Sequence, residues 1–297
     1  MNESLSFMCD KASFAVASIK DDTHSFIAYY DDTMLEAAIK YKTIVDEFDD
    51  AIKAGEFKMY LQPQISAKTR RLTGAEALVR RIKPDGTIIS PIDFIPVYEK
   101  SGLISRLDRY IWEQAAAKLG EWKKAGINMS ISVNISPKDF YYIDIFNTFA
   151  GLIKKYDIEP SNLKIEITET TIMSDVPNLM GELEELRKAG FTLEMDDFGS
   201  GYSSLNTLKD INVDVLKVDM GFIKETKNVK KSRIILASVI KMAKELNLLI
   251  ITEGVETEEQ VDNLTKLGCD VFQGYYFSKA IDVNEFEKRY LYRKKAG

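Results

Sequence analysis

The order of apolar and polar positions predicts alternating strands and helices over most of the chain. From Phe57 onward, short apolar stretches recur, and most are followed by a segment with helical spacing. This alternation is typical of α/β proteins with a largely parallel sheet. The predicted strands are Phe57–Ile65, Leu72–Arg81, Met129–Ile135, Leu163–Thr168, Thr192–Met195, Val215–Asp219, Leu249–Thr252 and Val271–Phe277.

Capping residues mark the ends of the predicted helices. Ser90-Pro91 is typical of a helix start, and Thr257-Glu-Glu-Gln260 has the pattern of a capping box. Gly126, Gly190 and Gly268 each follow a lysine-containing segment and precede a predicted strand. A glycine after a cationic last turn is typical of a helix C-terminus.

Eight strands that alternate with helices favour a closed barrel. About six residues link the first two predicted strands, which is too short for a crossover helix, so this pair is predicted to be antiparallel. The predicted fold class is therefore α/β, a modified TIM-type (β/α)8 barrel with an antiparallel first strand. A doubly wound open sheet is the alternative, but Gly199-Ser-Gly201 lacks the third glycine of a dinucleotide-binding turn.

The first part of the chain differs from the rest. Phe7–Ile19 has helical spacing and Ser25–Tyr30 alternates like a strand, but residues 1–33 are too few to fold alone. We interpret them as the remnant of an upstream domain. Residues 34–55 are predicted to form a connecting helix that ends at Gly55, and residues 56–297 to form the barrel domain.

Composition excludes several functions. The net charge of -6 argues against a DNA or RNA polymer as partner, and no apolar run approaches membrane-spanning length. Two cysteines, Cys9 and Cys269, do not form a zinc pattern, and we expect reduced thiols in a cytoplasmic protein. The single histidine, His24, lies in a polar stretch. Acid–base chemistry must therefore fall to carboxylates or lysine.

One stretch carries the most distinctive candidate chemistry. Apolar Phe191–Met195 is followed by Asp196 and Asp197 and then by a glycine-rich turn that reaches Tyr202. Two adjacent carboxylates repel each other unless a cation lies between them. A turn or a helix cap is the alternative explanation for such a pair. The same pattern of a strand followed by a carboxylate recurs along the chain, which favours a shared site.

Polar residues lie at or near the carboxyl ends of seven predicted strands, where barrel enzymes place their catalytic groups. These residues are Glu76, Asn134, Glu166, Glu169, Asp196, Asp197, Lys217, Asp219, Glu253, Glu256 and Gln273. A ring of acids at one mouth predicts bound cations, and a set of oxygen donors favours Mg²⁺ or Mn²⁺ over zinc or copper.

Hard divalent ions bridged by carboxylates suit phosphate-ester chemistry, in which one ion generates hydroxide and a second stabilises the departing oxygen. Lys217 is a candidate general base or water-orienting group, and neutralisation of acids or phosphate is equally compatible. Arg80 is suited to bidentate contact with a phosphate, or alternatively to an ion pair with a neighbouring acid. The residues alone thus predict a metal-dependent hydrolase or lyase.

The motifs resemble those of the EAL-domain family of cyclic di-GMP phosphodiesterases over roughly residues 50–290. Glu76-Ala-Leu-Val-Arg80 resembles the family signature, and further motifs follow in order. They are Leu61-Gln-Pro63, Ser90-Pro-Ile-Asp-Phe-Ile-Pro96, Ser101-Gly-Leu-Ile104, Ser132-Val-Asn-Ile-Ser136, Glu166-Ile-Thr-Glu169, Asp196-Asp-Phe-Gly-Ser-Gly-Tyr-Ser-Ser-Leu205, Leu216-Lys-Val-Asp219, Glu253-Gly-Val-Glu256 and Gln273-Gly-Tyr-Tyr-Phe277. Residues 1–33 also resemble, more weakly, the end of a degenerate GGDEF domain.

The resemblance implies hydrolysis of cyclic di-GMP to linear pGpG with Mg²⁺ or Mn²⁺ in a two-metal site. The metal ligands would be Glu76, Asn134, Glu166, Asp196 and Asp197. The catalytic set would be Glu76, Asp196, Asp197, Lys217, Glu253 and Gln273, and substrate contacts would come from Gln62, Leu78, Arg80, Asp219, Glu253 and Gln273. Glu169 would brace the loop after Asp196. No member of this set is missing; Ser200, Thr252 and Ala280 depart from the usual Thr, Ala and Pro.

The resemblance also implies a homodimer formed near the loop after Asp197, which contains Phe198 and Tyr202; inward packing of both aromatics is the alternative. Ca²⁺ is expected to inhibit, because it is larger than Mg²⁺ and a weaker Lewis acid. Two other functions stay open: a cyclic di-GMP sensor without turnover, and a protein-interaction module. The complete set of acids favours the enzyme.

Overall fold

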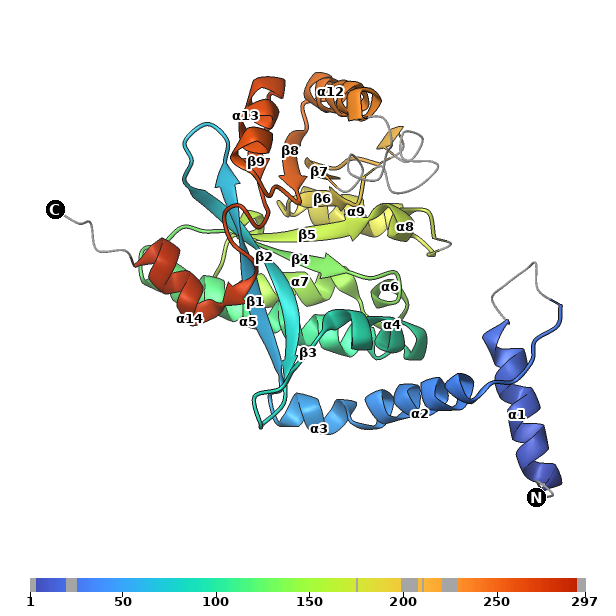
Figure 1. Ribbon diagram of the computed structural model, residues 1–297. Helices are drawn as coiled ribbons and strands as arrows, with labels where there is room; N and C mark the ends of the chain where they lie inside the picture. The colour runs from blue at the N-terminus through green and yellow to red at the C-terminus, as the bar shows by residue number, and fades with distance from the viewer. Residues whose placement is uncertain are drawn as a thin grey trace.

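A closed barrel forms the centre of the computed structural model (Figure 1). The structure describes residues 4–19, 26–174, 176–198, 208, 209, 211–220 and 229–292. In these ranges the sheet order is β10-β1-β9-β8-β7-β6-β5-β4-β2-β3, and pairing of β1 with β2 closes it. The strands are β1 Phe57–Ser66, β2 Leu72–Ile82, β3 Ile88–Ile89, β4 Ile131–Ile135, β5 Leu163–Thr168, β6 Leu193–Asp196, β7 Val215–Asp219, β8 Leu249–Glu253, β9 Val271–Phe272 and β10 Ile281–Asp282.

The predicted barrel with an antiparallel first strand is confirmed. β1 pairs antiparallel with both β2 and β9, whereas the pairs from β2 through β4 to β9 are parallel. β3 and β10 are two-residue strands that extend the edges of this ring. Because β4 to β9 run in one direction, their carboxyl ends meet at one mouth, and β2 contributes Glu76 from its middle.

Helices cover the outside of the barrel. They are α4 Pro91–Ser101, α5 Ile104–Lys124, α6 Asp139–Tyr142, α7 Ile145–Tyr156, α8 Glu169–Ile172, α9 Leu179–Lys188, α12 Val229–Glu245, α13 Glu258–Leu267 and α14 Val283–Phe286, with short 3-10 and π turns at Pro160–Asn162 and Glu287–Leu291. The predicted start of α4 at Ser90 and the capping box of α13 are both observed. Gly126, Gly190 and Gly268 follow helices with φ of 75°, 95° and 94°.

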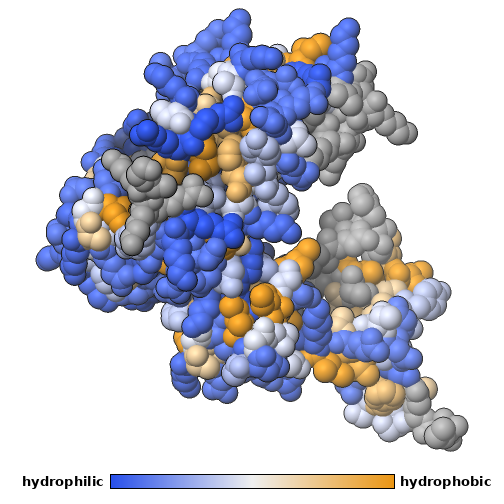
Figure 2. Space-filling model, turned by 60° about the vertical axis from the view of Figure 1, so that its left-hand side comes forward, coloured by the Kyte–Doolittle hydropathy of each residue, from blue (hydrophilic) through white to orange (hydrophobic). Residues whose placement is uncertain are grey.

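The N-terminal segment differs from its prediction in two respects. The predicted strand Ser25–Tyr30 is not observed: Phe26–Tyr30 is irregular and pairs with no strand of the described residues. The single connecting helix is observed as two helices, α2 Asp32–Asp46 and α3 Phe48–Lys53, with Glu47 between them. α1, α2 and α3 form an N-terminal arm, and α1, Leu5–Ser18, lies at the end of the arm far from the barrel (Figure 1). Apolar residues gather on the arm (Figure 2), where Leu5, Val16 and Phe26 are exposed.

α3 packs against the barrel through aromatic and ionic contacts. The rings of Phe48 and Tyr98 lie 4.9 Å apart, edge to face. Buried Arg81, on β2, pairs with Glu47 at 2.7 Å and with Glu56 at 2.9 Å. The last helix before β1 is therefore part of the packed barrel and not a free linker.

The last parallel strand is shorter than predicted. β9 ends at Phe272, where the chain packs closely against Val255 in the connection between β8 and α13. A Cβ atom on Gly274 would lie 2.2 Å from the carbonyl oxygen of Val255, so only glycine permits this approach. The backbone bonds Gln273 N to Thr252 O and Val255 N to Gln273 O hold the turn. Gln273 consequently sits at the barrel mouth.

Candidate active site

Lys217 lies at the centre of the mouth and is 1% exposed in its side chain. Its ammonium nitrogen is 2.7 Å from Glu166, 2.9 Å from Glu253, 3.2 Å from Asp196 and 3.5 Å from Glu76. These four acids come from β5, β8, β6 and β2, and Lys217 comes from β7. Five strands therefore bring four carboxylates around one cation.

This crowding shifts the pKa values of the mouth residues. Burial would lower the pKa of Lys217, but Glu166 and the other carboxylates outweigh it and raise that pKa well above its usual value. Burial, followed by repulsion from Glu76, raises the pKa of Glu166 well above normal. Burial, with the charges of Asp196 and Glu76, raises the pKa of Glu253 to about 8. Lys217 is thus a firmly charged ammonium in this arrangement.

A network of amides fixes the Glu76 carboxylate. Gln273 Nε2 donates to Glu76 Oε2 and, at 3.3 Å, to Gln62 Oε1. Gln64 Nε2 donates to Gln273 Oε1 at 3.2 Å. Asn134 Nδ2 lies 3.5 Å from Glu76 Oε1, and its main-chain carbonyl accepts from the Trp112 indole at 2.9 Å. The predicted residues Gln62, Glu76, Asn134 and Gln273 are therefore brought together.

Asp196 and Asp197 lie at the end of β6. Asp197 has a left-handed backbone with φ of 57°, which is uncommon for a residue other than glycine. Its N–H donates to Asp196 Oδ1 at 2.8 Å. Desolvation, followed by the charge of Asp196, raises the pKa of Asp197. Asp197 is exposed beside half-buried Asp196 at the end of β6, and the shared cation site stays a prediction.

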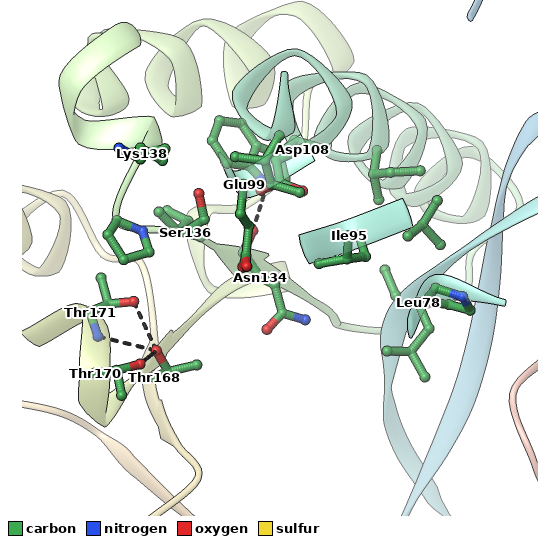
Figure 3. A pocket seen from close by; sticks show the side chains of 18 of the residues that line it. Leu78, Ile95, Glu99, Asp108, Asn134, Ser136, Lys138, Thr168, Thr170 and Thr171 are labelled. Carbon is green, nitrogen blue, oxygen red and sulfur yellow. Dashed lines mark hydrogen bonds between the residues drawn. The ribbon is translucent and has the colours of Figure 1, made fainter. Parts of the chain in front are cut away.

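A pocket of about 530 Å³ adjoins this centre. Leu78 and Ile95 line one side, and Lys138 and Thr168 line the other, with Glu99 and Asp108 above (Figure 3). Arg80 also lines it; its Nη1 donates to the Val79 carbonyl at 2.7 Å and its guanidinium faces the Tyr60 ring at 5.9 Å. The pocket therefore contains both Leu78 and Arg80, which were predicted to contact substrate.

The remaining predicted residues are placed as follows. Asp219 pairs in register with Glu253 at the ends of β7 and β8. Glu169 is buried at the start of α8, but residues 199–202, which it was expected to brace, lie outside the described residues. Phe198 is 4% exposed and packs inward, whereas Tyr202 is not among the described residues, so the predicted dimer contact stays a prediction.

Several polar residues of the barrel interior and the pocket were missed by the sequence reasoning. Gln64, Ser132 and Glu194 are buried, half-buried Lys164 reaches Glu194, and half-buried Asp108 forms an acid pair with buried Asp139 beside the pocket. Burial raises the pKa of Asp139 to about 6. Gly74 makes room for Gln64, since a Cβ there would lie 2.9 Å from Gln64 Oε1. Polar residues at alternate positions of otherwise apolar strands were the available signal.

The chemistry of the donors suits a hard divalent cation, although no three acids among the described residues are grouped closely enough to hold one as they stand. Glu166 Oε1 is buried and makes no hydrogen bond among the described residues, although the other oxygen of this carboxylate binds Lys217. A buried carboxylate oxygen without a donor is costly unless a cation approaches it. The neighbouring ligands are carboxylate and amide oxygens, which Mg²⁺ and Mn²⁺ prefer.

The chain belongs to the EAL domain family, whose profile matches residues 45–280. It is 34% identical to the signaling protein YkoW of Bacillus subtilis over 94% of this chain and 35% of YkoW. It is 30% identical to the bifunctional diguanylate cyclase/cyclic di-GMP phosphodiesterase MucR of Pseudomonas aeruginosa, over 92% of this chain and 40% of MucR. The chain thus spans less than half the length of these relatives.

Solved structures share the barrel. A structure described as PaMucR phosphodiesterase in complex with c-di-GMP matches with a TM-score of 0.76 at 32% identity, covering 82% of this chain and 99% of that one. The c-di-GMP-bound FimX EAL domain from Pseudomonas aeruginosa matches with a TM-score of 0.73 at 22% identity, covering 80% and 96%, and shows the shared fold alone. The predicted family membership is therefore confirmed.

Among the described residues, the helices are too short or too polar for any of them to cross a lipid bilayer.

Proposed function

We propose that this chain hydrolyses one phosphodiester bond of cyclic di-GMP to give linear pGpG. The observation that carries the proposal is the convergence of Glu76, Glu166, Asp196 and Glu253 on Lys217 at one barrel mouth. Relatives that share the EAL domain are named cyclic di-GMP phosphodiesterases. A full set of acids on these strands supports turnover over mere structural pairing.

Two divalent cations, Mg²⁺ or Mn²⁺, complete the proposed site. Glu76, Asn134, Glu166 and Asp196 would hold the first, and Asp196 with Asp197 the second. When bound, such ions lower the pKa of water and neutralise charge on a phosphate. The chain's own part is to fix the ligands: Gln273 and Asn134 hold the Glu76 carboxylate, and the left-handed turn at Asp197 places the second carboxylate at the rim.

Substrate contacts are proposed to come from both sides of the mouth. Arg80 and Leu78 line the pocket of about 530 Å³, which is large enough for a nucleobase with part of its sugar. Gln62 and Asp219 lie near Gln273 and Glu253 respectively, through a 3.3 Å hydrogen bond and a shared strand register. These residues would hold the dinucleotide so that one phosphodiester lies over the acids.

Lys217 is proposed to orient the attacking water or a phosphate oxygen as a hydrogen-bond donor. In the metal-free protein the carboxylates around it, led by Glu166, hold its pKa well above normal, which favours the ammonium form over a neutral general base. An ammonium with three N–H donors suits orientation better than proton removal. Of the alternatives left open by the sequence, this charged state supports positioning over proton removal.

The proposed enzyme is expected to form a homodimer through the loop after Asp197. The second candidate function is a sensor that binds cyclic di-GMP without hydrolysing it. Purified protein should be incubated with cyclic di-GMP and Mg²⁺, and the products separated by chromatography. The enzyme yields pGpG, and chelation with EDTA abolishes it. Saturable binding without product in Mg²⁺ or Mn²⁺ would favour the sensor, and absence of both binding and product would favour an interaction module.

A further inference from the structure

A second polar layer lies directly beneath the proposed metal ligands. Glu194, on β6, is fully buried. Its Oε1 accepts from Lys164 Nζ on β5 at 2.9 Å, and its Oε2 accepts from Ser132 Oγ on β4 at 2.8 Å. Both carboxylate oxygens are therefore engaged by donors from two neighbouring strands. We call Ser132, Lys164 and Glu194 the lower layer.

Each member of the lower layer precedes a proposed ligand by two residues. Ser132 precedes Asn134, Lys164 precedes Glu166, and Glu194 precedes Asp196. Residues two apart on a strand point to the same face, so the lower layer lies on the interior face that carries the ligands.

The strand register places the layers in contact. Ser132 pairs with Lys164, and Glu166 pairs with Glu194, across adjacent parallel strands. Repulsion from Glu194 is among the influences that raise the pKa of Glu166. A change of charge in the lower layer must therefore be felt by the ligands above it.

Lys217 pairs with the mouth carboxylates and also acts electrostatically on Glu194. Above it are the four carboxylates of the mouth, within 3.5 Å. Below it is the Glu194 carboxylate, whose pKa is lowered by Lys164 and, to a lesser degree, by Lys217, against the effect of burial. If Glu194 lacked its own cation, it would become an unpaired buried anion, which is strongly unfavourable and would attract Lys217.

We propose that Lys164 and Ser132 act as positioning residues: they saturate the Glu194 carboxylate, so that Lys217 stays with the mouth carboxylates. The Lys164–Glu194 pair is neutral as a unit, and it sets the electrostatic potential beneath the cation site without adding net charge. Its part in turnover rests on the proposed function, whereas its effect on cation binding does not.

Single substitutions in the pair have opposite expected effects on Mn²⁺ affinity. Lys164→Met removes a positive charge below the site and should tighten Mn²⁺ binding, whereas Glu194→Gln leaves Lys164 unpaired and should weaken it. The double variant Lys164→Met/Glu194→Gln restores the neutral layer and should bind Mn²⁺ like the parent. Binding is measured by loss of the free Mn²⁺ signal in electron paramagnetic resonance, with far-UV circular dichroism to check folding.

Among these variants, we expect turnover to depend on whether Lys217 stays at the mouth and not on how tightly Mn²⁺ binds. In Lys164→Met the freed Glu194 draws Lys217 away from the mouth, so turnover should fall by about tenfold or more while KM changes little. The double variant should recover turnover to within about threefold of the parent, because no unpaired buried charge is left to attract Lys217; such non-additivity is expected of two residues in contact. Lys164→Arg, which keeps the charge, should behave like the parent.

Lys244→Met is the matched control, since Lys244 pairs with Asp270 at 2.8 Å outside the barrel interior. It should change thermal stability without changing Mn²⁺ affinity. If both single variants weaken Mn²⁺ binding in proportion to lost stability, the pair is only structural and the proposal fails. If Lys164→Met does not fold, parent-like Mn²⁺ binding in Glu194→Gln still overturns it.

Turnover and cation binding separate the two proposals. If Lys164→Met and Glu194→Gln change the Mn²⁺ affinity in opposite directions but the parent protein forms no pGpG, the role of the lower layer is upheld and the enzymatic function is contradicted. If the parent forms pGpG rapidly but the two variants do not change the Mn²⁺ affinity in opposite directions, the enzymatic function is upheld and the role of the lower layer is contradicted.

Discussion

Lys217 Nζ lies 2.7 Å from Glu166 Oε2, and both side chains are almost completely excluded from solvent. The contact joins β7 to β5 across the barrel mouth, past β6. It places a permanent cation against a carboxylate whose other oxygen, Oε1, has no hydrogen-bond partner among the described residues. This second oxygen is what makes Glu166 a candidate cation ligand.

Lys217→Ala should lower turnover far more than substrate affinity. The substitution removes the donor that orients the reacting groups, while Arg80 and the pocket remain to hold the dinucleotide. We expect a loss of about a hundredfold or more in kcat, the scale associated with removal of a single positioned donor. Steady-state kinetics and calorimetric binding in Ca²⁺ separate the two effects, with Lys244→Ala as control. Equal losses in both would indicate a ground-state phosphate contact.

Glu76→Ala should abolish hydrolysis. Glu76 accepts hydrogen bonds from Gln273 and Asn134 and pairs with Lys217, so its loss removes a ligand and the anchor of the amide network. The expected cost is several kcal/mol of transition-state stabilisation. Circular dichroism should report an intact fold, because the residue lies at the mouth. Activity within about tenfold of the parent would show that Glu76 is not a ligand.

Without divalent metal, thermal stability should fall as pH rises from about 5 to 9, a range set by ordinary and shifted carboxyl pKa values. Burial raises the pKa of Glu253 to about 8, so the folded chain keeps a proton that the unfolded chain has already lost. This stabilisation is complete below the unfolded pKa and disappears through the folded one. Burial raises the pKa of Asp139 to about 6, which acts in the same direction.

Glu253→Gln is the matched variant for this prediction, since it keeps the shape and removes the titration. Melting temperatures measured in EDTA across the pH range should show a smaller slope in the variant, above all between pH values of about 7 and 9. Identical slopes in parent and variant would mean that Glu253 titrates normally in the folded protein.

Ca²⁺ should support binding of cyclic di-GMP and block its hydrolysis. The carboxylates and Asn134 supply oxygens that Ca²⁺ accepts, at about 2.3–2.6 Å against about 2.0–2.1 Å for Mg²⁺. A misplacement of about 1 Å can reduce the rate about a hundredfold. Calorimetry in Ca²⁺ and product assays in each metal make the comparison. Rapid pGpG formation in Ca²⁺, after removal of trace metals, would refute the two-metal account.

The sequence predicted the positions of the barrel strands because each one is apolar-rich and most carry a polar group at or near the carboxyl end. The antiparallel first strand was also predictable, since the link from Ser66 to Leu72 leaves no room for a helix. The early end of β9 was not predictable, because it depends on the close approach of Gly274 to Val255, and the sequence pattern does not show that these two residues meet. Likewise, Phe26–Tyr30 alternates like a strand but has no partner strand.

The sequence predicted the site residues at the barrel mouth but not the polar residues beneath them. Positions at the carboxyl ends of strands marked Glu166 and Asp196 as site candidates, whereas Lys164 and Glu194 lie two residues earlier on the same strands and carried no such mark. The burial of Glu194 depends on its neutralisation by half-buried Lys164 across β5 and β6, at 2.9 Å, which only the three-dimensional structure reveals. The left-handed backbone of Asp197 is equally invisible in the sequence, because aspartate adopts that conformation only occasionally.

The most direct test of the proposed hydrolysis follows the oxygen of water. The protein is incubated with cyclic di-GMP and Mg²⁺ in water enriched in oxygen-18, and the products are analysed by mass spectrometry. Hydrolysis at phosphorus predicts pGpG with one oxygen-18 atom in its terminal phosphate, and Glu76→Ala should give none. Unchanged cyclic di-GMP, under conditions where calorimetry shows that the protein is saturated with it, would contradict the enzymatic account.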